Sequence, residues 1–334
     1  MAPKYIKKAC LIVSGLAPIV FASWAYGNDT ESAQQATPAR TASVRLMPKA
    51  SSWTLRLPKD DNVMFQGVVS FDGAGAGHGQ MLYPGFGGLV GFLAAIVTHG
   101  AIVDSAKEAQ KTKLQEEADK VLGPYQSVLA AFSHKDLMQA GLEKISMSGT
   151  KTLVGFAEKP SADWRVESTP VFMMTQDQSA IILDNLITVY APDAPAAAYQ
   201  NVIRVVSHPR DAADLSAFWT ANQGKTLKDE SVSLFAHSLD IALGEATNGP
   251  SKESNSQKTF RYPEGGTEKM ERAQLISEHC NRTVVKTLRD SLMSIPARGT
   301  TAADKCGTGR QPEVSTGQFF SSTTVNRSYI GAAP

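Results

Sequence analysis

The chain has 334 residues, with 33 basic and 32 acidic side chains, and 42% of its residues are hydrophobic. A net charge of +1 excludes a general nucleic-acid binder, because such proteins carry an excess of basic residues. The hydrophobic fraction is enough for a sizeable core, and the length predicts one or two domains.

Residues 1–27 are typical of a secretory signal peptide. Lysines at positions 4, 7 and 8 precede the uncharged, mostly apolar run Ala9–Ala22. Small residues then stand where a signal peptidase reads them, which predicts cleavage after Ala25 or Gly27. An uncleaved anchor is the alternative, although the apolar run is short for a membrane span. We therefore expect a periplasmic or secreted protein with a signal of bacterial style.

Composition divides the remaining chain into three regions. Residues 28–52 are small and polar, which predicts a flexible leader. Residues 53–296 carry periodic apolar patterns and predict an α+β globular region, with a subdivision left open near 191–198. Residues 297–334 are again small and polar and predict a tail.

The first elements of the globular region are short. Alternating apolar and polar residues predict strands at 52–57 and 62–71. Residues 104–123 are rich in Ala, Lys, Glu and Gln, which favour a helix that ends at Gly123-Pro124. Two shorter helices, 124–132 and 134–145, and a strand at 151–158 follow.

An uncharged stretch, Gly85–Val103, lies before the first of these helices. Its nineteen residues are long enough to span a bilayer, but five of them are glycine. Gly87, Gly91 and Ala95 recur every four residues, and such a stripe of small residues allows another backbone to approach closely. We expect a helix that packs closely in a soluble fold. A membrane-associated helix and a true span are the alternatives.

The middle of the chain is the clearest β region. Runs rich in β-branched residues at 168–175, 179–190 and 198–207 are separated by short polar turns, which predicts an antiparallel meander. Asp184-Asn185 interrupts the second run and leaves open a bulge or a further turn.

Helical patterns dominate the remainder. Two amphipathic helices are predicted at 214–224 and 229–246, and the second places Val232, Phe235, Leu239 and Leu243 on one face. A short strand at 258–262 comes next. A long last helix is predicted from Thr267 to Pro296, since apolar residues recur at every fourth position: Ile276, Cys280, Val284, Leu288 and Leu292.

Together these elements predict an α+β fold. It has a mostly antiparallel sheet with a central β meander, helices packed on one side, and a long glycine-striped helix near the N-terminal third.

Motifs for catalysis are scarce. No two of the six histidines have the i, i+4 spacing of a metal site, and the glycine-rich stretches fit neither the dinucleotide nor the phosphate-loop pattern. Ser148 and Lys151 match S-x-x-K without its companion motifs. A group of charged residues at 271–282 reads as the solvated face of the last helix, with pairs such as Glu278–Arg282. We predict no catalytic, cofactor-binding or metal-binding residue.

These observations favour a non-catalytic protein of the cell envelope that binds or scaffolds, with the glycine-striped helix as its contact element. Its partner would be a protein or a membrane component of the envelope, or a second copy of the chain, and not a nucleic acid. The alternative is a secreted hydrolase whose site is assembled only in three dimensions, since carboxylate or Ser/His sites need no sequence motif.

We predict a disulfide between Cys280 and Cys306, the two cysteines that remain once Cys10 leaves with the signal peptide. On the predicted helix Cys280 faces the core, and the bond would fasten the polar tail to it. The closed loop spans 306 − 280 = 26 residues, so the bond would stabilise the fold by roughly 3.5 kcal/mol. Thiol titration of the unreduced, denatured mature protein should detect no free thiol. Two free thiols per chain would contradict the bond.

Overall fold

The computed structural model describes residues 46–69, 105–158, 163–249, 256–279 and 281–297. Ten strands form one mixed sheet, mostly antiparallel, in the order β3-β1-β4-β5-β6-β10-β9-β8-β7, and β2 pairs with β4. The predicted combination of helices with a mostly antiparallel sheet is confirmed. The strands are β1 (Trp53–Arg56), β2 (Met64–Gly67), β3 (Lys151–Val154), β4 (Trp164–Met174), β5 (Ile181–Tyr190), β6 (Ala197–Val206), β7 (Gln257–Glu264), β8 (Thr267–His279), β9 (Arg282–Thr287) and β10 (Leu292–Pro296).

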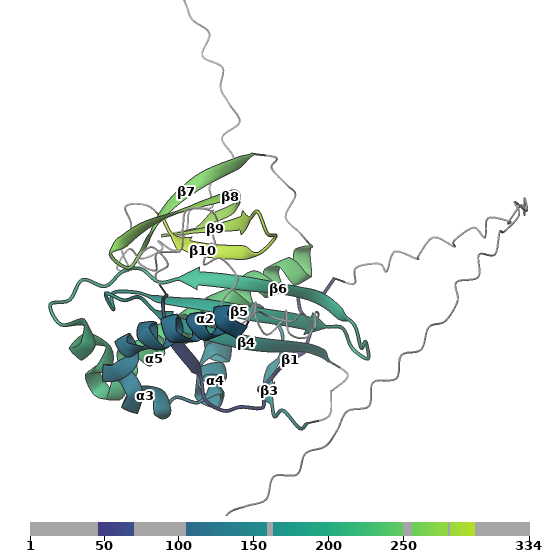
Figure 1. Cartoon of the computed structure of the whole chain (residues 1–334). Helices are drawn as coiled ribbons and strands as arrows, with labels where there is room; N and C mark the ends of the chain where they lie inside the picture. Colours follow the sequence, from purple (N-terminus) through teal and green to yellow (C-terminus); the bar gives the residue numbers. More distant parts are fainter. Residues whose placement is uncertain (1–45, 70–104, 159–162, 250–255, 280, 298–334) are drawn as a thin grey trace, which may run out of the picture. The chain divides into compact units, whose positions relative to one another are not determined.

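The described helices are few. Figure 1 shows α5 beside the strands β5 and β6, and α4 packs against α5 and β3. The helical elements are α2 (Ser105–Ala118), the 3-10 helix η1 (Asp119–Tyr125), α3 (Gln126–Ala130), α4 (His134–Lys144) and α5 (Leu215–Asn248).

The predicted meander is formed by β4, β5 and β6. Leu183 of β5 pairs with Phe172 of β4 on one side and with Val205 of β6 on the other. The strand continues through Asp184 and Asn185 without a bulge or turn, because each of these polar side chains is buried with partners on its own face of the sheet.

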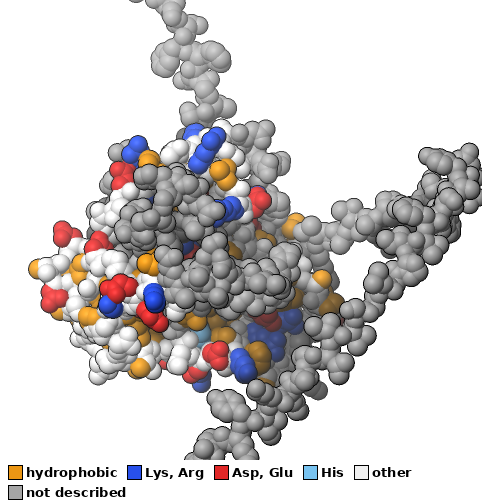
Figure 2. Space-filling model, in the orientation of Figure 1, with side chains coloured by type: hydrophobic (Ala, Val, Ile, Leu, Met, Phe, Trp, Pro, Cys, Tyr) orange, Lys and Arg blue, Asp and Glu red, His pale blue; other side chains and the backbone are white. Residues whose placement is uncertain are grey.

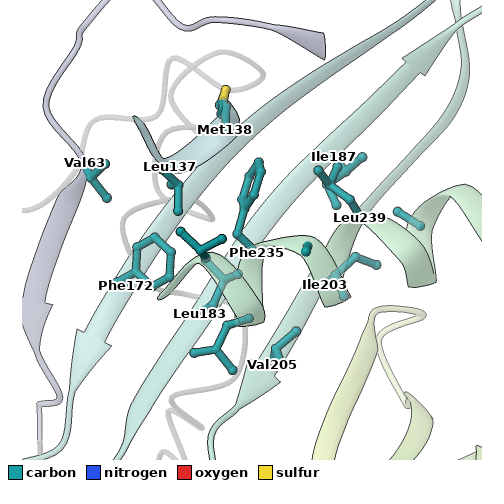
Figure 3. Close-up of a cluster of buried hydrophobic side chains, with 14 of the residues drawn as sticks. Val63, Leu137, Met138, Phe172, Leu183, Ile187, Ile203, Val205, Phe235 and Leu239 are labelled. Carbon is teal, nitrogen blue, oxygen red and sulfur yellow. The ribbon is translucent and has the colours of Figure 1, made fainter. Parts of the chain in front are cut away.

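The main hydrophobic core lies between the sheet and the helices. Figure 3 shows Leu183, Ile203 and Val205 from the meander facing Phe235 of α5. The four residues predicted to share one face of this helix, Val232, Phe235, Leu239 and Leu243, are all buried.

The opposite face of the sheet has a smaller core of its own. It joins Met173 of β4 and Ile182 of β5 with Tyr262 of β7 and Val285 of β9. Strands β4 and β7, which are six places apart in the sheet order, therefore meet on this face, so the sheet curls along its C-terminal strands.

One polar turn, Thr175–Ala180, holds the curl in place. The Asp177 carboxylate accepts hydrogen bonds from Thr175 Oγ1 at 2.6 Å, from the Ser179 backbone at 3.1 Å and from the Gly266 backbone of the β7–β8 hairpin. Burial raises the pKa of Asp177, but these hydrogen bonds outweigh it and hold the pKa below its usual value. From the same turn, Gln178 O accepts a hydrogen bond from Trp219 Nε1 of α5 at 2.7 Å.

The predicted last helix is wrong. Residues 267–296 form β8, β9 and β10 instead. The recurrence of apolar residues at every fourth position was coincidental. Within β9 burial alternates residue by residue: Thr283, Val285 and Thr287 are buried while their neighbours are partly exposed. A second signal was Gly265-Gly266, a typical two-residue hairpin turn, which joins the paired residues Glu264 and Thr267.

Two helical parts are present within α5, as predicted, but the break between them falls inside the first predicted helix, 214–224, and not after it. Residues Ala221–Gly224 leave helical geometry, and Gly224 has a φ of +74°. A Cβ at this glycine would lie 2.1 Å from Val128 Cγ1 of α3, so the position requires glycine both for its backbone angle and for space.

Packing of α4 against α5 should depend on Gly141. A Cβ there would lie 2.5 Å from Cδ1 of the buried Phe235 ring. We expect Gly141→Ala to lower the free energy of unfolding by about 1–2 kcal/mol, since overpacking outweighs the gain in helix propensity. Urea denaturation measures the change.

Gly244→Ala in α5 is the matched control. Nothing lies within 4 Å of a Cβ at this helical glycine. The substitution should raise stability by up to about 1 kcal/mol. Equal effects of the two substitutions would contradict the close contact.

Candidate functional site

A groove lies between α4 and the first strand in the sheet order, β3. It is a hollow of about 390 Å³. Gln139, Leu142 and Glu143 of α4 form one wall, and Lys151, Thr152 and Leu153 of β3 form the other.

Within the described residues, no strand pairs with the outer edge of β3. Among the described strands, β3 pairs only with β1, in parallel. Trp53 N donates to Thr150 O at 3.0 Å and Leu57 N donates to Val154 O at 2.9 Å. Because backbone groups alternate along a strand, those of Lys151 and Leu153 point away from β1 and toward the groove side.

Local contacts fix the distance between the two walls. Ser133 caps the start of α4 by accepting a hydrogen bond from Asp136 N at 3.0 Å. In the short link to β3, Lys151 Nζ donates to Ile145 O at 2.6 Å, and Ser146 N donates to Asp240 Oδ1 of α5 at 2.9 Å. The link is therefore tied both to the strand and to the long helix.

The groove offers mixed chemistry. Leu142 is buried at its base, Gln139 and Glu143 are exposed on the helix, and Leu153 is partly exposed on the strand. Backbone groups at the edge, an apolar base and one charge of each sign suit an extended polypeptide. On the part of the described surface that is visible in Figure 2, basic and acidic side chains are interspersed. That surface therefore offers no patch of a single charge as another candidate site.

The segment after β3 folds toward β1. Arg56 Nε donates to Phe156 O at 3.0 Å, and the Arg56 guanidinium lies 5.0 Å from the centre of the Phe156 ring. Arg56 alternates with Leu55, which belongs to the helix-side core, so this contact lies on the opposite face of the sheet from the groove.

A buried ion pair lies in the smaller core. Asp184 of β5 accepts two hydrogen bonds of 2.7 Å from Arg204 of β6. Burial lowers the pKa of Arg204, but Asp184, with a smaller contribution from Glu264 of β7, raises it above its usual value. A paired, enclosed guanidinium of this kind specifies register and offers no site for chemistry.

A serine and a histidine also meet inside the protein. Ser294 Oγ of β10 lies 2.9 Å from His237 Nε2 of α5, and Arg282 Nε of β9 donates to the same oxygen at 2.9 Å. Burial and the charge of Arg282 lower the pKa of His237 to about 4, so the ring is neutral at pH 7. Ser294 has no exposed surface, so a substrate has no access to it as the protein is folded.

The residues predicted from sequence have different outcomes. Gly87, Gly91, Ala95, Cys280 and Cys306 lie outside the described residues. The helix that was expected to carry Cys280 is replaced by strands, so the argument that this cysteine faces a core along a helical stripe is wrong. The pairing of the two cysteines stays a prediction.

Other candidate pairs are separated. Ser148 Oγ donates to Lys49 O at 3.1 Å while Lys151 Nζ donates to Ile145 O, so the S-x-x-K pair is not a nucleophile with its base. The predicted Glu278–Arg282 pair along a helix is also wrong, since Glu278 stands opposite Thr283 in the β8–β9 ladder and Arg282 bonds Ser294.

The groove was missed because sequence spacing does not show which strand lies at an edge. The sequence singled out Lys151 as part of an S-x-x-K motif. In the structure, the features of Lys151 that contribute to the groove are its backbone groups and its position opposite α4. His237 and Ser294 are 57 residues apart, and no local pattern links them.

No group of three or more His, Cys, Asp or Glu side chains in the described ranges is arranged to hold a metal ion. None of the helices among these residues is both long and apolar enough to cross a membrane. No protein-family model, curated protein or solved structure matches the chain.

Acid should destabilise the fold through His237. The unfolded chain protonates this ring near pH 6.5, and the folded pKa is about 4, so the unfolded state binds more protons between these values. The contribution of the neutral ring to the free energy of unfolding is fully present above pH 6.5. It is lost as the pH drops toward 4, by up to about 3 kcal/mol. Denaturation of His237→Gln across this range should show a correspondingly smaller loss.

His279→Gln is the control, because His279 is exposed and its charge makes the smallest of the contributions that lower the pKa of His237. This variant should keep most of the loss. A His237→Gln protein with the same pH dependence as the wild type would contradict the neutral, buried state of the ring.

Proposed function

We propose that the chain is a non-catalytic protein of the cell envelope that binds an extended segment of a partner polypeptide along β3. The observation that carries the proposal is the open edge of β3 beside the groove with α4. Main-chain hydrogen bonds to such an edge supply affinity, and side-chain contacts in the adjoining groove supply selectivity.

The edge favours a reversible interaction. Two outward-facing residues, Lys151 and Leu153, provide up to four backbone hydrogen bonds, each contributing about 0.5–1.5 kcal/mol net. Alternate side chains of the incoming segment would lie over Leu142 or beside Glu143. A few such contacts correspond to an affinity in roughly the micromolar range.

Export and the glycine stripe extend this proposal. The signal-like N-terminus would place the protein in the periplasm or outside the cell, where the partner would be an envelope protein or membrane component. Gly87, Gly91 and Ala95 would form a second, helical contact element, to that partner or to another copy of the chain.

A hydrolase is the second candidate, and the contact between Ser294 and His237 favours it. Hydrolysis would require the buried serine to become accessible. Covalent labelling of Ser294 in the folded protein by a fluorophosphonate probe would support the hydrolase over the binding protein.

Peptide selection tests the proposed site. Random 12-residue peptides displayed on phage should include binders of the full chain, and the bound peptide should slow hydrogen exchange at the amides of Lys151 and Leu153. Leu153→Pro removes one outward N–H and leaves the hydrogen bonds to β1 in place. We expect it to weaken peptide binding at least about tenfold, as loss of an edge hydrogen bond and crowding by the ring predict.

Leu153→Val is the matched control, since it trims the same side chain but keeps the N–H. It should bind the selected peptides nearly as well as the wild type. Selection that enriches no peptide, or peptides that bind Leu153→Pro and the wild type equally, would overturn the assignment of β3.

A further inference from the structure

A second hollow lies at the C-terminal end of α5, away from β3 in the sheet order. It has a volume of about 230 Å³. The last turns of α5, β6, and β9 with its following turn form its walls. Its polar side chains are those of Tyr199, Asn201, Glu245, Lys286 and Asp290. It lies below the range of roughly 300–1,000 Å³ typical of pockets for drug-sized ligands, so any ligand is small.

Glu245 is the central group of this hollow. Its carboxylate is partly buried, and Oε2 accepts a hydrogen bond from the Tyr199 hydroxyl at 3.2 Å. Burial raises the pKa of Glu245, and the opposing effects of Tyr199 and Lys286 are smaller. The negative charge of this carboxylate is therefore incompletely compensated by its neighbours.

The one cationic side chain that lines the hollow, Lys286, is paired with another residue of its wall. Lys286 Nζ lies 3.1 Å from Asp290 Oδ1, on the turn after β9. The formal charges of Glu245, Lys286 and Asp290 sum to −1. The hollow also adjoins the C-terminal end of α5, where the helix dipole presents its negative pole.

We propose that this hollow binds a small organic cation, a primary ammonium compound. The ammonium group would lie against the Glu245 carboxylate and the Tyr199 hydroxyl, near the end of α5. The short apolar part of the ligand would contact Ala198 and Leu46, which complete the walls. This site is independent of the peptide groove. The groove is formed by α4 and β3, whereas this hollow is formed by β6, β9 and the C-terminal end of α5.

Titration calorimetry of the full chain with three ligands of matched shape tests the charge preference. At pH 7.5, n-butylamine should bind, whereas butyrate and n-butanol should not. Glu245→Gln keeps an acceptor for the Tyr199 hydroxyl and should lower amine affinity at least tenfold. Glu268→Gln, at an exposed position in the β7–β8 hairpin, should leave it unchanged.

Lys286→Met separates a cation site from an anion site. Loss of the competing ammonium should strengthen amine binding. The proposal is overturned if n-butylamine at 10 mM gives no heat of binding, if Glu245→Gln binds it like the wild type, or if butyrate binds and Lys286→Met abolishes that binding. Thermal denaturation of each variant confirms that it is folded.

Discussion

The turn Thr175–Ala180 is the constraint on which the rest of the described structure depends. The Asp177 carboxylate accepts hydrogen bonds from Thr175, within the turn, and from Gly266 of the β7–β8 hairpin, which lies at the far end of the strand order. The neighbouring Gln178 holds α5 through Trp219. Because these bonds leave from one short segment, the helical layer and the curled strands keep a fixed relation to the same meander.

The two faces of β5 show how this meander specifies its neighbours. Asp184 faces the smaller core and is satisfied by Arg204. Asn185, the next residue, faces the helices, where it accepts from Ser168 Oγ at 2.7 Å and donates to Ser238 Oγ at 2.9 Å. A shift of register by one residue would leave both polar groups without these partners in a buried environment, so the pair fixes the alignment of three strands and one helix.

Sequence patterns predicted well those elements whose periodicity spans a whole segment. The meander and the apolar face of α5 follow directly from β-branched runs and from residues such as Phe235 and Leu239. The C-terminal strands were missed because Ile276, Val284 and Leu292 satisfy a helical spacing by chance, while the alternation of Thr283, Val285 and Thr287 is short. Neither the groove nor the Ser294–His237 contact could be predicted, since both arise from strand order and curl, which depend on distant segments.

The parallel pair β6–β10 is a seam between segments far apart in the chain. Leu292 pairs with Ile203, a separation of 292 − 203 = 89 residues. As synthesis proceeds from the N-terminus, the meander and α5 are complete before residue 292 exists, and β6 meanwhile has an unpaired side. Closing so long a loop costs entropy before the contact forms, which makes this docking a slow step of folding. A nascent or truncated chain that lacks β10 therefore exposes an unpaired edge on β6, in addition to the edge of β3. This second edge can pair with another chain and so gives a route to aggregation that the complete protein does not have.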